Sequence, residues 1–325
     1  MNASRPLIRT ASAASALGLC ALALSGCGLG GSGAEENGKV KVVASFYPMK
    51  FLAQQIGGEH VEVESLTKPG TEPHDLELSP QQTARLSEAD LVVYLKGLQP
   101  AVDEGVQQAE PEHVAEATSY TDLEKHGGDV HGEDGHEKEG HGEDHGHGDS
   151  SGGEQDGDPH VWLDPVRYAE IAGGVGEQLA KADPAHRATY RKNTSDLRKR
   201  LMSLDEEYKS TLRKKKTDTF ITTHAAFGYL AERYRLHEAA VTGVDPDSEP
   251  SGARMKRLHK IAKADDVDTV FFESSASDRT AKTLAGDLNL KTGVLSPLET
   301  AEKGEDYFSV MRQNLLSLRT ALGAD

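Results

Sequence analysis

The chain has 325 residues, of which 36% are hydrophobic and 5% aromatic, and its formal net charge is −17 at pH 7. A chain of this length can bury a sizeable core, and we expect two domains once targeting and unstructured segments are set aside. The excess of carboxylates argues against a nucleic-acid-binding surface or an anionic-lipid patch, because both need clustered lysine and arginine.

The first 27 residues are typical of a lipoprotein signal peptide. Arg5 and Arg9 form a basic start, and the apolar run over residues 11–24 is too short to span a membrane as a mature helix. A Leu-Ser-Gly-Cys sequence ending at Cys27 resembles a bacterial lipobox, with an ordinary secretory signal as the alternative. We therefore expect Cys27 to carry a lipid. Because Cys20 leaves with the signal peptide, no disulfide is expected within the mature chain.

Residues 28–38 are glycine-rich and polar, which predicts a flexible tether. Beyond the tether, apolar runs alternate between strand and helix periods, predicting a mostly parallel sheet flanked by helices in an N-terminal α/β lobe over residues 39–184. His74 ends a loop with two prolines, beyond the carboxyl end of a predicted strand. The predicted strands cover residues 39–45, 61–66 and 90–95 and a stretch near Val114, and the predicted helices run through Phe51 to Gly57 and over residues 79–89 and 100–109.

Residues 124–158 interrupt this lobe with an abrupt change of composition. The 35 residues include 11 glycines, 12 carboxylates and six histidines, and they cannot build a core. A solvated acidic linker is one interpretation, but such a linker needs no imidazoles. We therefore predict that the insertion collects several metal ions weakly, because flexible ligands lose conformational entropy on binding. The histidines of the insertion are His126, His131, His136, His141, His145 and His147.

The second half of the chain repeats the alternation of strands and helices. A helix is predicted from Asp164-Pro165 to residue 182, and a longer one over residues 185–214 spans about 45 Å and is interpreted as a strut between two lobes. A C-terminal α/β lobe follows over residues 215–325. Its strands are predicted over residues 218–223, 238–242, 268–272 and 291–295, and its helices over residues 228–235, 251–264, 278–288 and 305–322.

Three histidines outside the insertion stand out by their positions. His160 lies between two prolines where the insertion ends, while His74 and His224 each follow a predicted strand. Open α/β sheets gather ligands beyond the carboxyl ends of their strands, and three imidazoles with one carboxylate are typical of zinc sites. Glu299 and Glu273 both follow strands, so either one can supply the carboxylate.

Several stretches of the chain form a combined pattern that is more specific than any one of them. They are Ala44-Ser45-Phe46-Tyr47-Pro48, the loop ending at His74, the histidine-rich insertion, the Asp-Pro-His-Val-Trp-Leu-Asp-Pro run around His160, the Thr-Thr-His-Ala-Ala-Phe-Gly-Tyr run around His224, and Leu-Ser-Pro-Leu-Glu ending at Glu299. Together they resemble the zinc-binding lipoproteins of metal-uptake ATP-binding-cassette transporters. The resemblance covers nearly everything after Cys27.

This resemblance implies two α/β lobes bridged by one rigid helix, with the metal in the cleft between them. It places the four metal ligands at His74, His160, His224 and Glu299. Manganese-binding relatives carry a carboxylate at the position of His224, so the imidazole here favours Zn²⁺. The implied protein is an extracytoplasmic receptor, anchored through Cys27, that acts as a monomer and delivers zinc to a membrane permease of the transporter.

Other functions also fit parts of the sequence. A manganese receptor of the same family and a surface zinc buffer or adhesin are the nearest alternatives. A zinc hydrolase needs an open coordination position, and the chain has neither a His-Glu-x-x-His helix nor a Gly-x-Ser-x-Gly elbow, so no enzyme is expected. Asp75 and Asp164 are candidates to orient ligand imidazoles, although helix capping already explains Asp164. No role is assigned to His60, His113, His186, His237 and His259.

Overall fold

The computed structural model describes residues 38–126, 157–246, 248, 250–273, 282–283, 285–287 and 289–324. The predicted signal peptide, Cys27, the tether, the five insertion histidines after His126 and most of the helix predicted over residues 278–288 lie outside these residues. Residues 38–325 form one compact unit, so the boundaries drawn at residues 184 and 215 stay a prediction. Within the described part of the chain, no helix is both long and apolar enough to cross a membrane.

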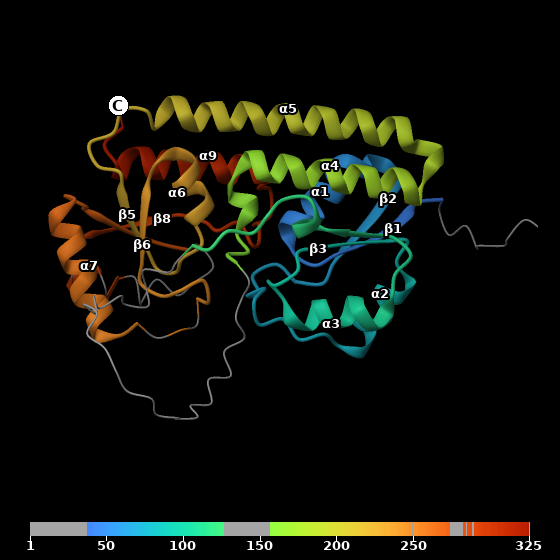
Figure 1. The fold of residues 1–325 in the computed structure, drawn as a ribbon, viewed down its shortest axis with the longest axis horizontal. Coiled ribbons are helices and arrows are strands. Elements are labelled where there is room, and N and C mark those ends of the chain that lie inside the picture. The colour runs from blue at the N-terminus through green and yellow to red at the C-terminus, as the bar shows by residue number, and fades with distance from the viewer. Residues whose placement is uncertain are drawn as a thin grey trace, which may run out of the picture. The chain divides into compact units, whose positions relative to one another are not determined.

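The first half contains the parallel sheet that the apolar runs predict. Its strand order is β2-β1-β3-β4, with every neighbouring pair parallel (Figure 1). All four residues of β3 are buried, as expected for a parallel strand covered on both faces. The strands are β1 (Val40–Ala44), β2 (Val61–Ser65), β3 (Leu91–Tyr94) and β4 (Val114–Glu116), and the helices between them are α1 (Tyr47–Gly57), α2 (Pro80–Glu88) and α3 (Pro100–Ala109).

The helix starts follow the predicted signals. Ser79 caps α2 with a complete capping box to Gln82, and proline occupies an early position in each of α1, α2 and α3. Short 3₁₀ turns were not predicted, because three residues leave no periodic signal. They are η1 (Gly58–His60), η2 (Ala117–Ser119), η4 (Val161–Leu163) and η5 (Pro184–His186).

The second half contains a second parallel sheet, with strand order β6-β5-β7-β8. β6 begins one residue earlier than predicted and ends at Ala240, two residues before the predicted end. The backbone amides of Val241 and Thr242 still donate hydrogen bonds to the carbonyls of Thr222 and Thr223. α7 begins after its cap at Ser251. The strands are β5 (Thr219–Thr222), β6 (His237–Ala240), β7 (Thr269–Phe272) and β8 (Lys291–Val294), and the helices are α6 (Gly228–Tyr234), α7 (Gly252–Ala264) and α9 (Tyr307–Ala321).

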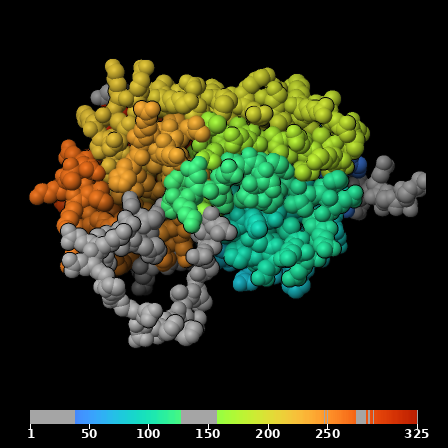
Figure 2. Space-filling model, viewed as in Figure 1, coloured from blue at the N-terminus to red at the C-terminus, as the bar shows by residue number. Residues whose placement is uncertain are grey.

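Two long helices pack against each other, and the longer one contacts both halves. α4 (Pro165–Ala182) matches its prediction, whereas α5 (Arg187–Thr211) is shorter than the predicted strut at both ends. The first residues of that strut form η5, and α5 still spans about 37 Å. α5 contacts α1 and α4 from the first half and α9 from the second, and α4 and α5 lie together in the space-filling view (Figures 1 and 2). One helix therefore supports both sheets.

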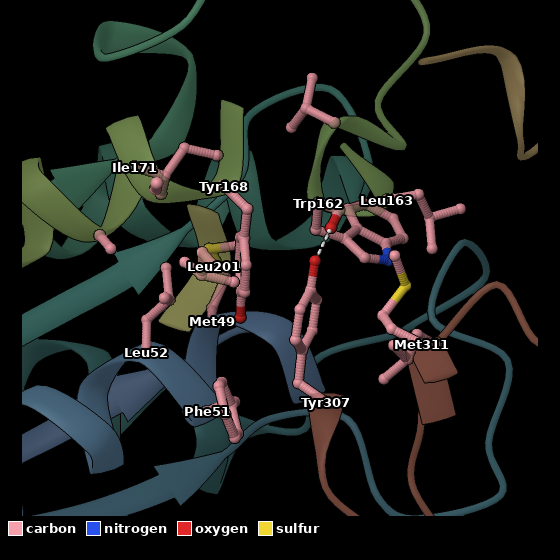
Figure 3. Packing of buried hydrophobic residues seen from close by; sticks show 14 of the residues in the cluster. Met49, Phe51, Leu52, Trp162, Leu163, Tyr168, Ile171, Leu201, Tyr307 and Met311 are labelled. Carbon is pink, nitrogen blue, oxygen red and sulfur yellow. Dashed lines mark hydrogen bonds between the residues drawn. The ribbon is translucent and has the colours of Figure 1, made fainter. Parts of the chain in front are cut away.

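Trp162, two residues after His160, joins the two halves. Its indole Nε1 donates a 2.7 Å hydrogen bond to the carbonyl of Pro297. The hydroxyl of Tyr307 donates a 2.7 Å bond to the carbonyl of Trp162 (Figure 3). The indole also packs edge to face with Phe46, at 4.9 Å between ring centroids. These residues belong to one buried cluster that runs through both halves, so the segment carrying His160 and the turn carrying Glu299 are held together.

Candidate metal centre

Four side chains from separate segments converge in the described part of the chain. His74, His160, His224 and Glu299 each offer one ligand atom, and these atoms all lie within 4.8 Å of one another. His74 lies in the loop after β2, His224 follows β5 and Glu299 follows β8, whereas His160 precedes η4 and α4. The carboxyl ends of parallel strands therefore supply three of the four groups, as the strand pattern predicts.

The distances between these atoms suit a small tetrahedral ion. His74 Nε2 lies 3.4 Å from Glu299 Oε1, and His160 Nε2 lies 3.3 Å from the same oxygen. Ligand bonds of about 2.0–2.2 Å give tetrahedral edges of roughly 3.3–3.6 Å. His224 Nε2 lies 4.0 Å from Glu299 Oε1, so a small movement of this ring completes the geometry.

The same four atoms have no hydrogen-bond partner. Among the described residues, the Nε2 atoms of His74, His160 and His224 and Oε1 of Glu299 are buried without one. A buried polar group left in this way costs about 1–3 kcal/mol. Four such groups aimed at one point are expected where a bound cation supplies the missing interaction. The rings of His160 and His224 are almost fully buried, whereas the His74 side chain is 8% exposed and lies nearest to solvent.

Two carboxylates orient the buried imidazoles. His160 Nδ1 donates a 2.7 Å hydrogen bond to Oδ1 of Asp158, and His224 Nδ1 donates to Oε1 of Glu273. Because a carboxylate only accepts, each Nδ1 carries a proton, and each Nε2 is the nitrogen left facing the centre for a metal. Carboxylates commonly hold metal-binding histidines in this way.

These orienting residues are not the two candidates that the sequence offered, although the expected capping role of Asp164 is confirmed. Asp164 caps α4 through Val166 N and bonds Arg233, while no hydrogen bond joins Asp75 to an imidazole among the described residues. Asp158 was missed because it ends the insertion, although its spacing two residues before His160 was a usable signal. Glu273 was considered only as a rival metal ligand. Its role with His224 depends on β7 lying beside β5, which the sequence did not reveal.

The ionisable groups of the centre shift one another's pKa values. Burial alone raises the pKa of Glu299, but the adjacent imidazoles of His160, His74 and His224 lower it well below its usual range. Burial lowers the pKa of His160, whereas Asp158 and Glu299 raise it, and the result is a pKa of about 10. A proton on His160 therefore balances the carboxylates when no metal is bound.

The comparisons with known proteins agree with this chemistry. A family model described as zinc-uptake complex component A, periplasmic (ZnuA), matches residues 42–321. The chain belongs to the ZnuA family. By its description, the family supplies a periplasmic component of a zinc-uptake complex, which is a solute-binding role in transport.

Relatives of the ZnuA family resemble the chain over most of its length. The "Zinc-binding protein AdcA" of Streptococcus pyogenes is 36% identical over 288 residues, which are 87% of this chain and 56% of that protein. The chain thus spans about half the length of the curated relatives it matches first. The "High-affinity zinc uptake system protein ZnuA" of Bacillus subtilis is 35% identical over 315 residues, covering 93% of this chain and 95% of that protein.

Solved structures give the same result for the ZnuA fold. Zn(II)-bound AdcA from Streptococcus pneumoniae superposes with a TM-score of 0.71 at 32% identity, covering 88% of this chain and 58% of that one. The laminin-binding protein of Streptococcus agalactiae, described as a bifunctional protein with adhesin and metal transporting activity, gives a TM-score of 0.74 at 28% identity, covering 87% of this chain and 99% of that one. The predicted α/β architecture with two parallel sheets and a long helix is confirmed.

Proposed function

We propose that this protein is an extracytoplasmic receptor that binds Zn²⁺ through His74, His160, His224 and Glu299 and delivers it to a membrane permease. The observation that carries the proposal is the set of four buried ligand atoms, which converge without hydrogen-bond partners in the described part of the chain. Membership of a zinc-uptake family supports the same cargo and the same kind of partner.

The donor set favours zinc over manganese. Three imidazole nitrogens and one carboxylate oxygen suit the borderline-soft Zn²⁺, whereas Mn²⁺ prefers sites richer in oxygen. The same set argues against hydrolysis, because four protein ligands leave no position for an activated water. The protein is therefore proposed to bind and release its metal without catalysing a reaction.

Growth under zinc limitation distinguishes a zinc-uptake receptor from a surface zinc buffer or an adhesin. A strain lacking the gene is expected to grow poorly in zinc-depleted medium and to recover with added zinc or with the wild-type gene. A gene encoding His160→Ala should fail to restore growth, and one encoding His113→Ala should restore it. If the deletion leaves zinc-limited growth and cellular zinc unchanged, the receptor function is wrong.

We also propose that a lipid on Cys27 anchors the protein to the membrane surface and that the protein acts there as a monomer. Replacing Cys27 with serine should release the protein from the membrane fraction or leave it unprocessed, because no helix in the described residues can hold it in a bilayer. Fractionation with metabolic lipid labelling measures this. Labelling of the Cys27→Ser protein at the wild-type level contradicts the assignment.

The histidine-rich insertion is proposed to collect zinc weakly near the receptor. Five of its histidines, His131, His136, His141, His145 and His147, lie outside the described residues, and their repeat with glycine and carboxylates supports several loose sites. The sixth, His126, is described and does not join the group of four.

Zinc affinity is expected to rise with pH well above neutrality. Metal and proton compete for Nε2 of His160, whose pKa is about 10 in the metal-free protein rather than the usual 6.5. Below that pKa, zinc must displace one proton from His160, so lowering the pH by one unit lowers the zinc affinity by about tenfold. Chelator-competition titrations between pH 7 and pH 9 measure the slope. An affinity that stays constant over this interval contradicts the proposed role of His160.

Glu273→Gln is expected to weaken zinc binding by about tenfold while leaving one zinc per chain. The change removes the charge that holds the His224 ring but keeps all four proposed ligands. Chelator competition gives the affinity, and Glu302→Gln, an exposed change near Glu299, is the matched control. Equal affinities for the two variants mean that Glu273 does not position His224.

A further inference from the structure

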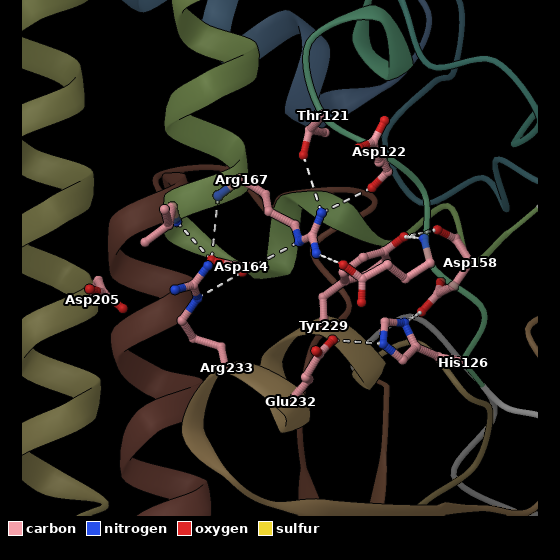
Figure 4. Close-up of polar contacts among 12 residues, drawn as sticks. Thr121, Asp122, His126, Asp158, Asp164, Arg167, Asp205, Tyr229, Glu232 and Arg233 are labelled. Atoms are coloured by element: carbon pink, nitrogen blue, oxygen red, sulfur yellow. Dashed lines mark hydrogen bonds and ion pairs between the residues drawn. The ribbon is translucent and has the colours of Figure 1, made fainter.

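The two ends of the histidine-rich insertion are joined where they leave the folded part of the protein. The amide of Asp158 donates a 2.7 Å hydrogen bond to the carbonyl of Glu124. The hydroxyl of Tyr229 accepts from the amide of Glu124 and donates to the carbonyl of Asp158, both at 2.7 Å (Figure 4). His126 is thereby held in the folded structure, against the expectation that the whole insertion lacks structure.

His126 lies between two carboxylates. Its Nδ1 is 3.0 Å from Oδ2 of Asp158, and its Nε2 is 3.2 Å from Oε2 of Glu232 on α6 (Figure 4). The ring packs edge to face on Tyr229, with centroids 4.4 Å apart. Glu124, His126 and Glu232 each offer a ligand atom within 4.8 Å of the other two.

The hydrogen bond to Asp158 determines what His126 presents to Glu232. The Asp158 side chain is fully buried and its carboxylate only accepts, so Nδ1 of His126 donates and the lone pair of Nε2 faces Glu232. Two acceptors 3.2 Å apart need a cation between them, either a metal ion or a proton on Nε2. The distance is close to the roughly 3.3 Å edge of a tetrahedral zinc site.

The surrounding charges also favour a cation. Glu124, Glu232 and Asp158 contribute three carboxylates, and of these Arg167 pairs with Glu124. The Glu232 side chain is 57% exposed, so solvent has access to the cluster.

We propose that Glu124, His126 and Glu232 form a second metal site, which we call the outer site, for a borderline divalent cation such as Zn²⁺. Asp158 positions both His126 of the outer site and His160 of the central site through its two oxygens. Three protein ligands and water complete the coordination, so the outer site binds zinc about tenfold or more weakly than the central one. The outer site uses none of the four central residues and goes beyond the proposed function.

Counting zinc in the full-length chain tests the outer site. His131, His136, His141, His145 and His147 are replaced with asparagine, which removes the other insertion imidazoles and keeps His126. Equilibrium dialysis against zinc is expected to give two ions per chain, one tight and one weak. Adding Glu232→Gln or His126→Asn should remove only the weak ion, whereas the matched changes Glu59→Gln and His113→Asn should remove neither.

The shared aspartate gives a second readout. Asp158→Asn is expected to lower both affinities, because both imidazoles lose their orienting carboxylate, whereas Glu232→Gln should lower only the weaker one. One zinc per chain in the five-asparagine protein would show that a proton satisfies His126, and it overturns the outer site. A weak ion that survives both Glu232→Gln and His126→Asn also overturns it. The tight ion reports on the central site separately, so failure of either proposal is recognised.

Discussion

Replacing His160 with alanine is expected to lower zinc affinity by more than about 100-fold, since loss of an orienting group alone typically costs 10- to 100-fold. The change removes a nitrogen donor at the most deeply buried position of the centre. Asp158 accepts hydrogen bonds from both the backbone amide and the Nδ1 of His160, and the substitution removes the second of these bonds. His160 thus contributes both a ligand and the partner of a buried carboxylate.

Affinity and folding must be measured together for this variant. Competition with a chromophoric chelator gives the affinity, and thermal unfolding of the metal-free protein shows whether the fold persists. His113→Ala, which alters a half-buried histidine outside the cluster, serves as the control. If the His160→Ala protein unfolds, His160→Gln replaces it, because its side-chain amide can still donate to Asp158. An affinity within about threefold of wild type in a folded variant contradicts the proposed centre.

Glu299→Ala is expected to weaken zinc binding by several tens of fold and to admit a water molecule to the metal. The carboxylate Oε1 lies 3.4 Å from His74 Nε2 and 3.3 Å from His160 Nε2. Its loss leaves three imidazoles and a vacant position, and Zn²⁺ accepts a water oxygen there. Binding of one zinc per chain should continue, because the three nitrogen donors remain.

Absorption spectra of the cobalt-substituted protein show the change in coordination. The wild-type spectrum should be that of a tetrahedral ion without an exchangeable water, and the Glu299→Ala spectrum should change with pH as the new water ionises. Glu302→Ala, an exposed change three residues away, should match wild type. A wild-type metal-bound water that titrates near neutral pH would contradict the closed site, and the hydrolase alternative would then return.

Local signals were sufficient for most helices and strands. α3 and α4 begin and end at the predicted residues because proline at the first helical position and the Asp164 cap act within one turn. The continuous apolar run of β3 predicted a buried parallel strand for the same reason. α5 was predicted too long because its first residues form a 3₁₀ turn, which has no distinct periodicity.

The sequence also identified the four candidate ligands, with help from the resemblance to a family. Positions beyond strand ends singled out His74 and His224, while the choice of Glu299 over Glu273 rested on the resemblance alone. In the structure Glu299 lies with the three imidazoles and Glu273 behind His224. The two carboxylates look alike in sequence, because each follows a strand in the same sheet.

Tertiary packing decided how the ligands are held. The Trp162 indole reaches the carbonyl of Pro297 across 135 residues of sequence. The pairing of Glu273 with His224 exists only because β7 lies next to β5. The cluster of Glu124, His126 and Glu232 likewise forms only where α6 meets the base of the insertion. Periodicity and capping act over a few residues, whereas these contacts depend on strand order and core packing between distant segments, so only the folded chain reveals them.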